Sequence, residues 1–150
     1  MRSLNSMLDE YAQSHQNPFN KTIHKLCVPT IMFSMIGLLW LIPSPKIMGD
    51  INWASIVTIF VMLYYLVLSK KYFIFMIPVI GSMYLGNHFL AQTNYLLSAS
   101  IIVFILSWIF QLWGHKVEGK KPSFAKDLLF LLIGPIWVVK AVFKINDENF

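Results

Sequence analysis

The side chains that could bind a metal ion or move protons are few in this sequence, with four histidines and seven acidic residues among 150. His15 and His24 lie just before the first long apolar stretch, and His115 ends the fourth. Glu118 follows His115 by three residues, which places both side chains on one side of a continuing helix. Three imidazoles and a carboxylate suit Fe(II), with open positions for O2 and a substrate, whereas zinc would activate water for hydrolysis. The pattern therefore predicts a metal site, provided that the fold brings these residues together.

The composition indicates the setting in which these residues must be positioned. Apolar residues make up 57% of the chain and charged residues only 13%, about half of the ~25% that a soluble domain carries. A small globule with so little polar surface could not cover itself in water. The composition excludes a disordered chain, a coiled coil and a nucleic-acid-binding protein, although the formal net charge is +5. It predicts an integral membrane protein whose partner is the lipid bilayer.

Gaps between charged residues mark the membrane spans. Residues 26–45 and 51–69 contain no Asp, Glu, Lys or Arg, and neither does the stretch 72–115, which the polar patch 86–94 divides. Each segment is close to the ~20 residues that cross a hydrocarbon layer, where helices satisfy their own backbone groups. We predict a single membrane domain over residues 1–150 with four transmembrane helices, at about 28–43, 51–69, 72–90 and 95–113.

A fifth apolar segment near the carboxyl end is too short to span. Residues 128–139 are bounded by charges and interrupted by Gly134-Pro135. At ~1.5 Å per residue this segment reaches about 18 Å. We therefore expect a re-entrant or interfacial pair of helices over residues 128–143.

The amino-terminal segment is polar and is expected to form an interfacial helix. Asn17-Pro18 signals a turn, after which Asn20 would cap a helix that begins at Lys21 and enters the membrane. The predicted fold class is all-α. It is an integral membrane four-helix bundle with an interfacial N-terminal helix and a short C-terminal re-entrant or interfacial segment.

The basic residues predict the orientation of this bundle. In the four-span topology nine of them fall on one face and only Lys46 falls on the other. The positive-inside rule makes the richer face cytosolic, and with it both termini and the three histidines. The membrane is the bacterial inner membrane or, in a eukaryote, that of the endoplasmic reticulum. The nine basic residues are Arg2, Lys21, Lys25, Lys70, Lys71, Lys116, Lys120, Lys121 and Lys126.

The fourth histidine, His88, lies near the far end of the third predicted span, about a membrane thickness from the others. Simple topology excludes it from their site, yet an ionisable residue within a span is a functional candidate, so it stays a secondary metal candidate. For all interfacial histidines the plainer alternative is hydrogen bonding to lipid headgroups. The chain has no Gly-rich phosphate loop, GxSxG motif or CxxC pair, and Cys27 is its single cysteine.

Two longer motifs resemble a known family. The run EYAQSHQNPFNKTIHKLCVPTIMFS is similar to the pattern Y-x3-H-x-N-P-x2-N-x3-H-x3-VP, and WIFQLWGHKVEGKKPSF is similar to W-x2-Q-x2-GH followed by Glu, a basic pair and Pro. Both patterns are those of the family of the fungal endoplasmic-reticulum 2-hydroxy fatty acid dioxygenase, which has bacterial members. The resemblance covers most of the chain. The chain differs from the family at three positions. A glycine is expected at the position of Cys27, and an acidic residue is expected at the position of Lys140. The glutamate after the GH motif is expected one residue later than Glu118.

The resemblance implies an Fe(II)-dependent α-oxidation, in which a long-chain 2-hydroxy fatty acid and O2 give the acid one carbon shorter and CO2. It assigns the metal to His15, His24 and His115, with Glu118 as a secondary metal candidate. Catalytic support or substrate hydrogen bonding would come from the polar residues at the remaining motif positions. These residues are Asn17, Asn20, Gln111 and Glu118.

Two other functions fit the same residues. One is a zinc-dependent membrane lipid hydrolase with Glu118 as the general base. The other is a non-catalytic membrane scaffold or transporter subunit, although the uncharged span interiors argue against an ion path. For the enzyme, the basic residues that could pair with the substrate carboxylate, or equally lie at the membrane surface, are Lys21, Lys25 and Lys116. The sequence predicts no particular acyl chain length, fourth ligand or oligomeric state.

Overall fold

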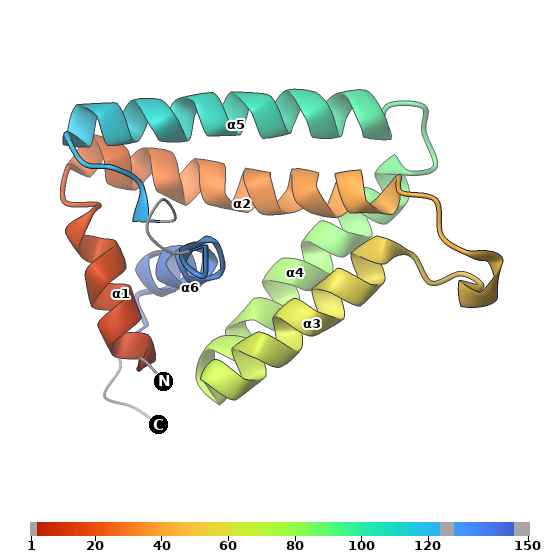
Figure 1. Cartoon of the computed structure of the whole chain (residues 1–150), viewed down its shortest axis with the longest axis horizontal. Coiled ribbons are helices and arrows are strands. Elements are labelled where there is room, and N and C mark those ends of the chain that lie inside the picture. The colour runs from red at the N-terminus through yellow and green to blue at the C-terminus, as the bar shows by residue number, and fades with distance from the viewer. Residues whose placement is uncertain (1–2, 124–127, 146–150) are drawn as a thin grey trace. The chain divides into compact units, whose positions relative to one another are not determined.

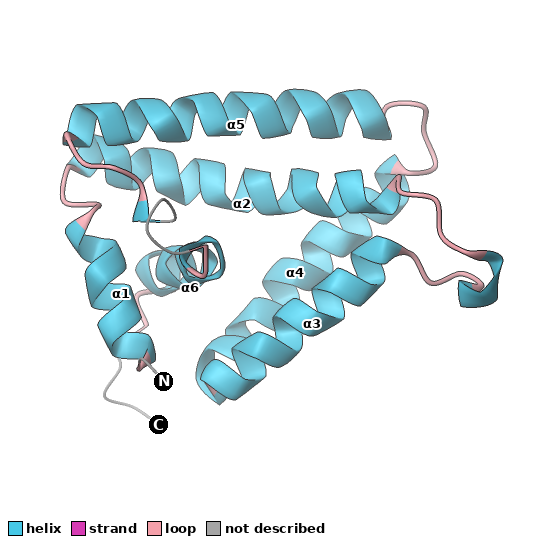
Figure 2. Ribbon diagram, viewed as in Figure 1, coloured by secondary structure: helices cyan, strands magenta, loops and turns pink. Residues whose placement is uncertain are grey.

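The computed structural model describes residues 3–123 and 128–145, and all regular structure in this part of the chain is helical (Figures 1 and 2). The prediction of an all-α chain is confirmed. A short 3-10 helix, Lys46–Met48, lies in the connection between the second and third α-helices. The α-helices are α1 (Leu4–Gln13), α2 (Pro18–Trp40), α3 (Trp53–Leu68), α4 (Lys70–Leu90), α5 (Leu96–Glu118) and α6 (Phe130–Phe143).

The chain forms two compact units. The first comprises Met1–Pro29 and Leu106–Phe150, and the second comprises Thr30–Ile105. In the first unit α1 packs against α6, and in the second α3 packs against α4. Because the boundaries fall inside α2 and α5, each of these helices contributes residues to both units.

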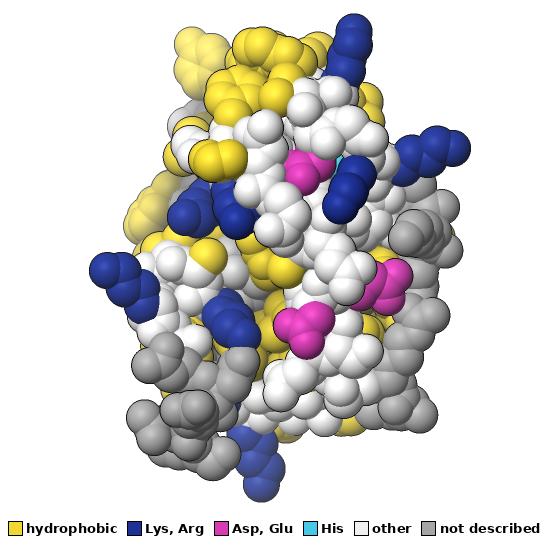
Figure 3. Space-filling model, turned by 90° about the vertical axis from the view of Figure 1, so that its left-hand side faces the viewer, with side chains coloured by type: hydrophobic (Ala, Val, Ile, Leu, Met, Phe, Trp, Pro, Cys, Tyr) yellow, Lys and Arg dark blue, Asp and Glu magenta, His cyan; other side chains and the backbone are white. Residues whose placement is uncertain are grey.

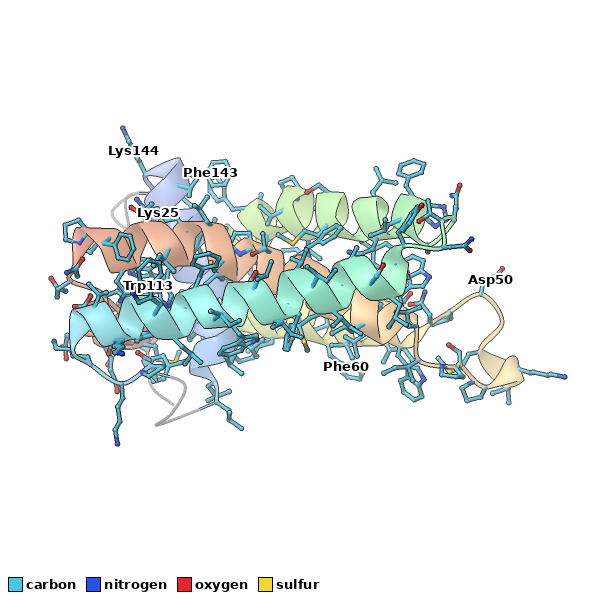
Figure 4. The ribbon with its side chains drawn as sticks, turned by 90° about the horizontal axis from the view of Figure 1, so that it is seen from above. Lys25, Asp50, Phe60, Trp113, Phe143 and Lys144 are labelled. Carbon is cyan, nitrogen blue, oxygen red and sulfur yellow. The ribbon has the colours of Figure 1, made fainter. Side chains whose placement is uncertain are left out.

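Three helices are long and apolar enough to cross a membrane, namely α2, α4 and α5, with 23, 21 and 23 residues. Their outward faces carry large apolar side chains in exposed positions, as expected of surfaces in contact with lipid. Phe60 on α3 and Trp113 on α5, both labelled in Figure 4, are exposed in the same way. The helix at the second predicted span, α3, has 16 residues and extends about 24 Å. The four-helix bundle and its four crossings therefore remain predictions.

The start of α2 differs from the expectation. The helix begins at Pro18, and the side chain of Asn17 accepts a hydrogen bond of 2.9 Å from the backbone N–H of Phe19. Proline suits the first position of a helix, because that residue needs no hydrogen bond from its backbone nitrogen. The prediction that Asn20 caps a helix from Lys21 is wrong, since the turn and cap come three residues earlier.

The carboxyl-terminal segment also differs from the expectation. The structure has one continuous helix, α6, where a pair of helices was expected, and Pro135 lies inside it. A proline inside a helix removes one backbone hydrogen bond. Here Pro135 and its neighbours Gly134 and Ile136 are buried, and the packing of this part of the helix offsets that loss. The interfacial or re-entrant position of this helix stays a prediction.

Candidate metal centre

Three histidines converge in the first unit. His15 follows α1, His24 lies on the first part of α2, and His115 lies in the last turn of α5. Their exposed fractions are 0%, 0% and 5%. One ring nitrogen from each lies within 4.8 Å of the others, and the ring centroids are 4.2 to 4.9 Å apart. Residues that are 100 positions apart along the chain thus meet at one point.

Backbone hydrogen bonds fix which nitrogen atoms face this point. Nδ1 of His15 donates to the carbonyl of Tyr11 at 2.6 Å, and Nδ1 of His24 donates to the carbonyl of Asn20 at 3.0 Å. A carbonyl oxygen only accepts, so the proton of each ring is on Nδ1 and Nε2 keeps its lone pair. These two Nε2 atoms and Nδ1 of His115 are buried with no hydrogen-bond partner among the described residues.

The protonation state of His15 agrees with this arrangement. Burial lowers the pKa of His15 to about 4, although its hydrogen bond to the Tyr11 carbonyl opposes the shift. The charge of His115 lowers the pKa further, that of Glu118 raises it and that of Lys21 lowers it. The ring is therefore neutral at pH 7. Neutral imidazole is the form that binds metal ions.

The donor set fits a metal ion. Buried polar atoms in folded proteins almost always have a partner, so three unpaired nitrogens pointing together need an explanation. A cation supplies one, because it binds ring nitrogens that no donor among the described residues reaches. Each of His15 and His24 also has its second ring nitrogen held by a carbonyl, the arrangement that orients histidine ligands in metal sites. Three imidazoles with further positions open suit Fe(II) or Zn(II).

Aromatic residues pack around His15. The ring of Tyr11 stacks on it at 4.2 Å, with 14° between the planes, and Trp137 of α6 lies 5.4 Å away. A Cβ atom at Gly134 would lie 2.9 Å from the Tyr11 hydroxyl, so the glycine allows α6 to approach α1 closely. None of these three residues is among the predicted site residues. Of the three, only Tyr11 has a signal in the sequence for its contact with His15, because it lies four residues before His15.

A second set of polar residues lies next to the histidines. The carboxylate of Glu118 accepts hydrogen bonds from the backbone N–H of Gln16 at 2.8 Å, the backbone N–H of Asn17 at 2.9 Å and the side chain of Asn20 at 3.1 Å. Asn20 is buried against Gly114, where a Cβ atom would collide with its Oδ1. The predicted residues Asn17, Asn20 and Glu118 therefore meet beside the triad.

The remaining predicted site residues are Gln111 and three lysines. Gln111 is buried one helical turn before His115 on α5. Lys21 is half-buried, whereas Lys25 (labelled in Figure 4) and Lys116 are exposed. On the face of the molecule drawn in Figure 3, histidine reaches the surface at one small patch, between an acidic side chain and a basic one.

His88 belongs to the second unit and is not in the histidine triad. It lies in the last turn of α4, where it is exposed. Its Nε2 is 3.3 Å from the side-chain nitrogen of Gln92, and its ring lies 5.9 Å from Trp40 and 5.8 Å from Phe89. Its role as a secondary metal candidate stays a prediction.

Comparison with known proteins agrees with the motifs seen in the sequence. A sequence model of the family described as 2-hydroxy-palmitic acid dioxygenase Mpo1-like matches residues 1–145. The chain is also 27% identical over 148 residues to the 2-hydroxy-palmitic acid dioxygenase MPO1 of Saccharomyces cerevisiae, a match that covers 95% of this chain and 82% of the yeast protein. No solved structure matches the chain.

Proposed function

The chain belongs to the 2-hydroxy-palmitic acid dioxygenase Mpo1-like family, and from this we propose that it is an Fe(II)-dependent dioxygenase of 2-hydroxy fatty acids. The reaction is an α-oxidation. One 2-hydroxy fatty acid and one O2 give the fatty acid one carbon shorter, CO2 and water. The C1–C2 bond is broken, C2 becomes the new carboxyl carbon, and O2 is the oxidant.

The observation that carries this proposal is the buried triad of unpaired nitrogens. Nε2 of His15, Nε2 of His24 and Nδ1 of His115 would hold the ion. Fe(II) bound there would supply the redox chemistry that activates O2, with positions left open for the substrate. A three-histidine site in an apolar chain otherwise has no structural purpose, because unpaired buried nitrogens only destabilise the fold.

The residues around the triad orient it and bind the substrate head. The carbonyls of Tyr11 and Asn20 keep the lone pairs of two rings aimed at the ion, and the rings of Tyr11 and Trp137 exclude water from one side of His15. Lys21 is half-buried and its charge acts on His15, which supports a role for it in pairing with the substrate carboxylate. Holding the carboxylate and the 2-hydroxyl together fixes C2 for reaction, and such positioning is a major source of rate enhancement.

The membrane supplies the route for the acyl chain. We propose a multi-pass protein with both termini and the triad on the cytosolic side, because nine basic residues fall on that face of the predicted topology. The long-chain substrate would then reach the triad from the lipid leaflet. Reporter proteins that are active only in the cytosol, or only outside it, fused to each terminus would test this orientation.

The decisive experiment combines metal analysis with turnover. Protein purified anaerobically and loaded with iron should consume O2 when given 2-hydroxypalmitate and release the odd-chain acid one carbon shorter. Palmitate, which lacks the 2-hydroxyl, is the matched control and should give no product. Stoichiometric zinc without iron, together with hydrolysis of an ester lipid, would overturn the dioxygenase proposal in favour of a zinc hydrolase.

A further inference from the structure

A single carboxylate joins the two segments that carry His15 and His115. Glu118 is the last residue of α5, three positions after His115, and it accepts the hydrogen bonds of the Gln16 and Asn17 amides. Gln16 directly follows His15 in the chain. The hydrogen bonds of Glu118 therefore hold the backbone next to one histidine against the helix that carries another.

Two further contacts strengthen the same junction. The side chain of Asn20 donates from one nitrogen to Glu118 at 3.1 Å and to the carbonyl of Ser14 at 3.4 Å. Beyond α5 the chain turns at Gly119, which has a φ of +72°, and Nζ of Lys120 donates to the carbonyl of Gln13 at 2.7 Å. The connection between α1 and α2 thus has hydrogen bonds to the end of α5 on both sides of His15.

The hydrogen bonds occupy the carboxylate of Glu118. Its two oxygens have about four acceptor positions and receive three donors. Among the residues that the structure describes, the converging group of ligand atoms contains the three histidines and not Glu118. Its negative charge nevertheless acts on all three imidazoles, which offsets part of the charge that a cation would bring.

We propose that Glu118 is a positioning residue: it holds the backbone beside His15 so that the three histidine nitrogens meet, without binding the metal itself. The part of this proposal that concerns metal binding rests on the proposed function, whereas the part that concerns the backbone does not. A charged acceptor is suited to this task, because hydrogen bonds from two backbone amides to a carboxylate are stronger than those to a neutral group.

The backbone part is tested in metal-free protein by amide hydrogen exchange. In Glu118→Gln the amides of Gln16 and Asn17 should exchange at least about tenfold faster than in the natural chain. A decrease of ~1.4 kcal/mol in the free energy of local opening corresponds to a tenfold increase in the exchange rate. Asp9→Asn removes an equal charge from an exposed position of α1 and is the control, with no change expected at these amides. Unchanged exchange in Glu118→Gln would overturn the proposal. Because glutamine has the same shape as glutamate, this variant carries the test even where Glu118→Ala fails to fold.

The metal part is tested with Co(II), whose visible spectrum reports its ligands. We expect Glu118→Gln to bind Co(II) about 10- to 100-fold more weakly, as is typical when a residue that orients a ligand is lost. At saturating Co(II) its spectrum should equal that of the natural chain, because the three imidazoles remain. A changed spectrum at saturation would make Glu118 a ligand and overturn the proposal. Absence of Co(II) binding to the natural chain would overturn the proposed metal centre, while the exchange experiment would still decide the backbone role.

Discussion

Each of the two compact units contains a buried polar cluster, and the two clusters differ in kind. In the first unit the cluster is the histidine triad. In the second unit it comprises Asn87 and Ser100, both fully or almost fully buried, beside Gly37. The amide nitrogen of Asn87 donates to the carbonyls of Phe33 and Met83, each at 3.0 Å, so this residue ties α4 to α2.

The unpaired atoms show the difference. In the triad they are ring nitrogens that lie close together, and two of them, Nε2 of His15 and Nε2 of His24, carry lone pairs and cannot donate. In the second cluster they are Oδ1 of Asn87, which is an acceptor, and Oγ of Ser100, a hydroxyl that donates and accepts. A Cβ atom at Gly37 would lie 2.6 Å from Oδ1 of Asn87 and still closer to Oγ of Ser100. The first cluster therefore suits a bound cation, whereas in the second cluster small and polar residues let the helices pack closely.

Removal of one triad nitrogen should give the largest effect. We expect His24→Ala to lose stoichiometric metal and O2-dependent turnover, because two imidazoles do not replace a three-ligand site. The measurement is metal content per chain together with O2 consumption. His88→Ala is the matched control from the second unit and should keep its metal. Equal loss of metal in both variants would contradict the separation of the two clusters.

Acid should destabilise the two clusters unequally. The pKa of His15 is about 4 in the folded chain and about 6.5 when unfolded, so the unfolded chain takes up the proton first as the pH falls. The free energy of unfolding is then highest above pH 6.5 and falls between pH 6.5 and pH 4, by up to about 3 kcal/mol from this group. Asn87, Ser100 and Gly37 do not titrate. Amide exchange of metal-free protein at pH 7 and pH 5 should show lost protection around His15 and none around Asn87, and the reverse result would contradict this assignment.

Added volume should damage the second cluster. In Gly37→Ala the new methyl group would collide with Ser100, and we expect a loss of roughly 1–3 kcal/mol of unfolding free energy with metal content retained. Gly81→Ala on α4 is the control, because a Cβ atom there meets nothing within 4 Å. Thermal unfolding in detergent gives the comparison. Combining Gly37→Ala with Ser100→Ala should restore part of the stability, since the colliding oxygen is gone.

The smallest effect is expected from the hydroxyl alone. Ser100→Ala removes a buried hydroxyl that has no hydrogen-bond partner among the described residues, so we expect a change of about 1 kcal/mol or less in the free energy of unfolding. A thermal shift of a few degrees or less should result. Ser98→Ala, at an exposed position on the same helix, should leave the midpoint unchanged. A loss of metal in Ser100→Ala would contradict the interpretation of this cluster as packing.

Sequence patterns predicted the helices better than the contacts between them. The uncharged stretches placed α4 and the start of α5 within two residues, because the polar residues 92–94 lie between the two helices. The predicted first span began at residue 28, whereas α2 begins at Pro18, because hydropathy detects only the apolar part of a helix that continues into polar sequence. The extension of α5 to Glu118 likewise lies outside the apolar run.

For the candidate site, the sequence indicated the residues but not their arrangement. Charge sorting placed His15, His24 and His115 on one predicted face, and the structure brings them together. The contact of Trp137 and Gly134 with the other end of the chain could not be predicted, because it depends on how α6 packs against α1. The hydrogen bonds of Glu118 also span about a hundred residues and leave no local pattern.

The shortness of α3 has a consequence for the membrane itself. The helix ends at Leu68 and α4 begins at Lys70, so the pair shares one end, yet α3 is five residues shorter. In the proposed four-span topology α3 also crosses the membrane, and a typical hydrocarbon layer of ~30 Å exceeds its ~24 Å, so the mismatch would be relieved where the bilayer thins by about 6 Å. The same chain is then better matched to a thin bilayer, such as that of the endoplasmic reticulum, than to a thick sterol-rich one. Bilayer thickness becomes a physical determinant of where such a protein resides.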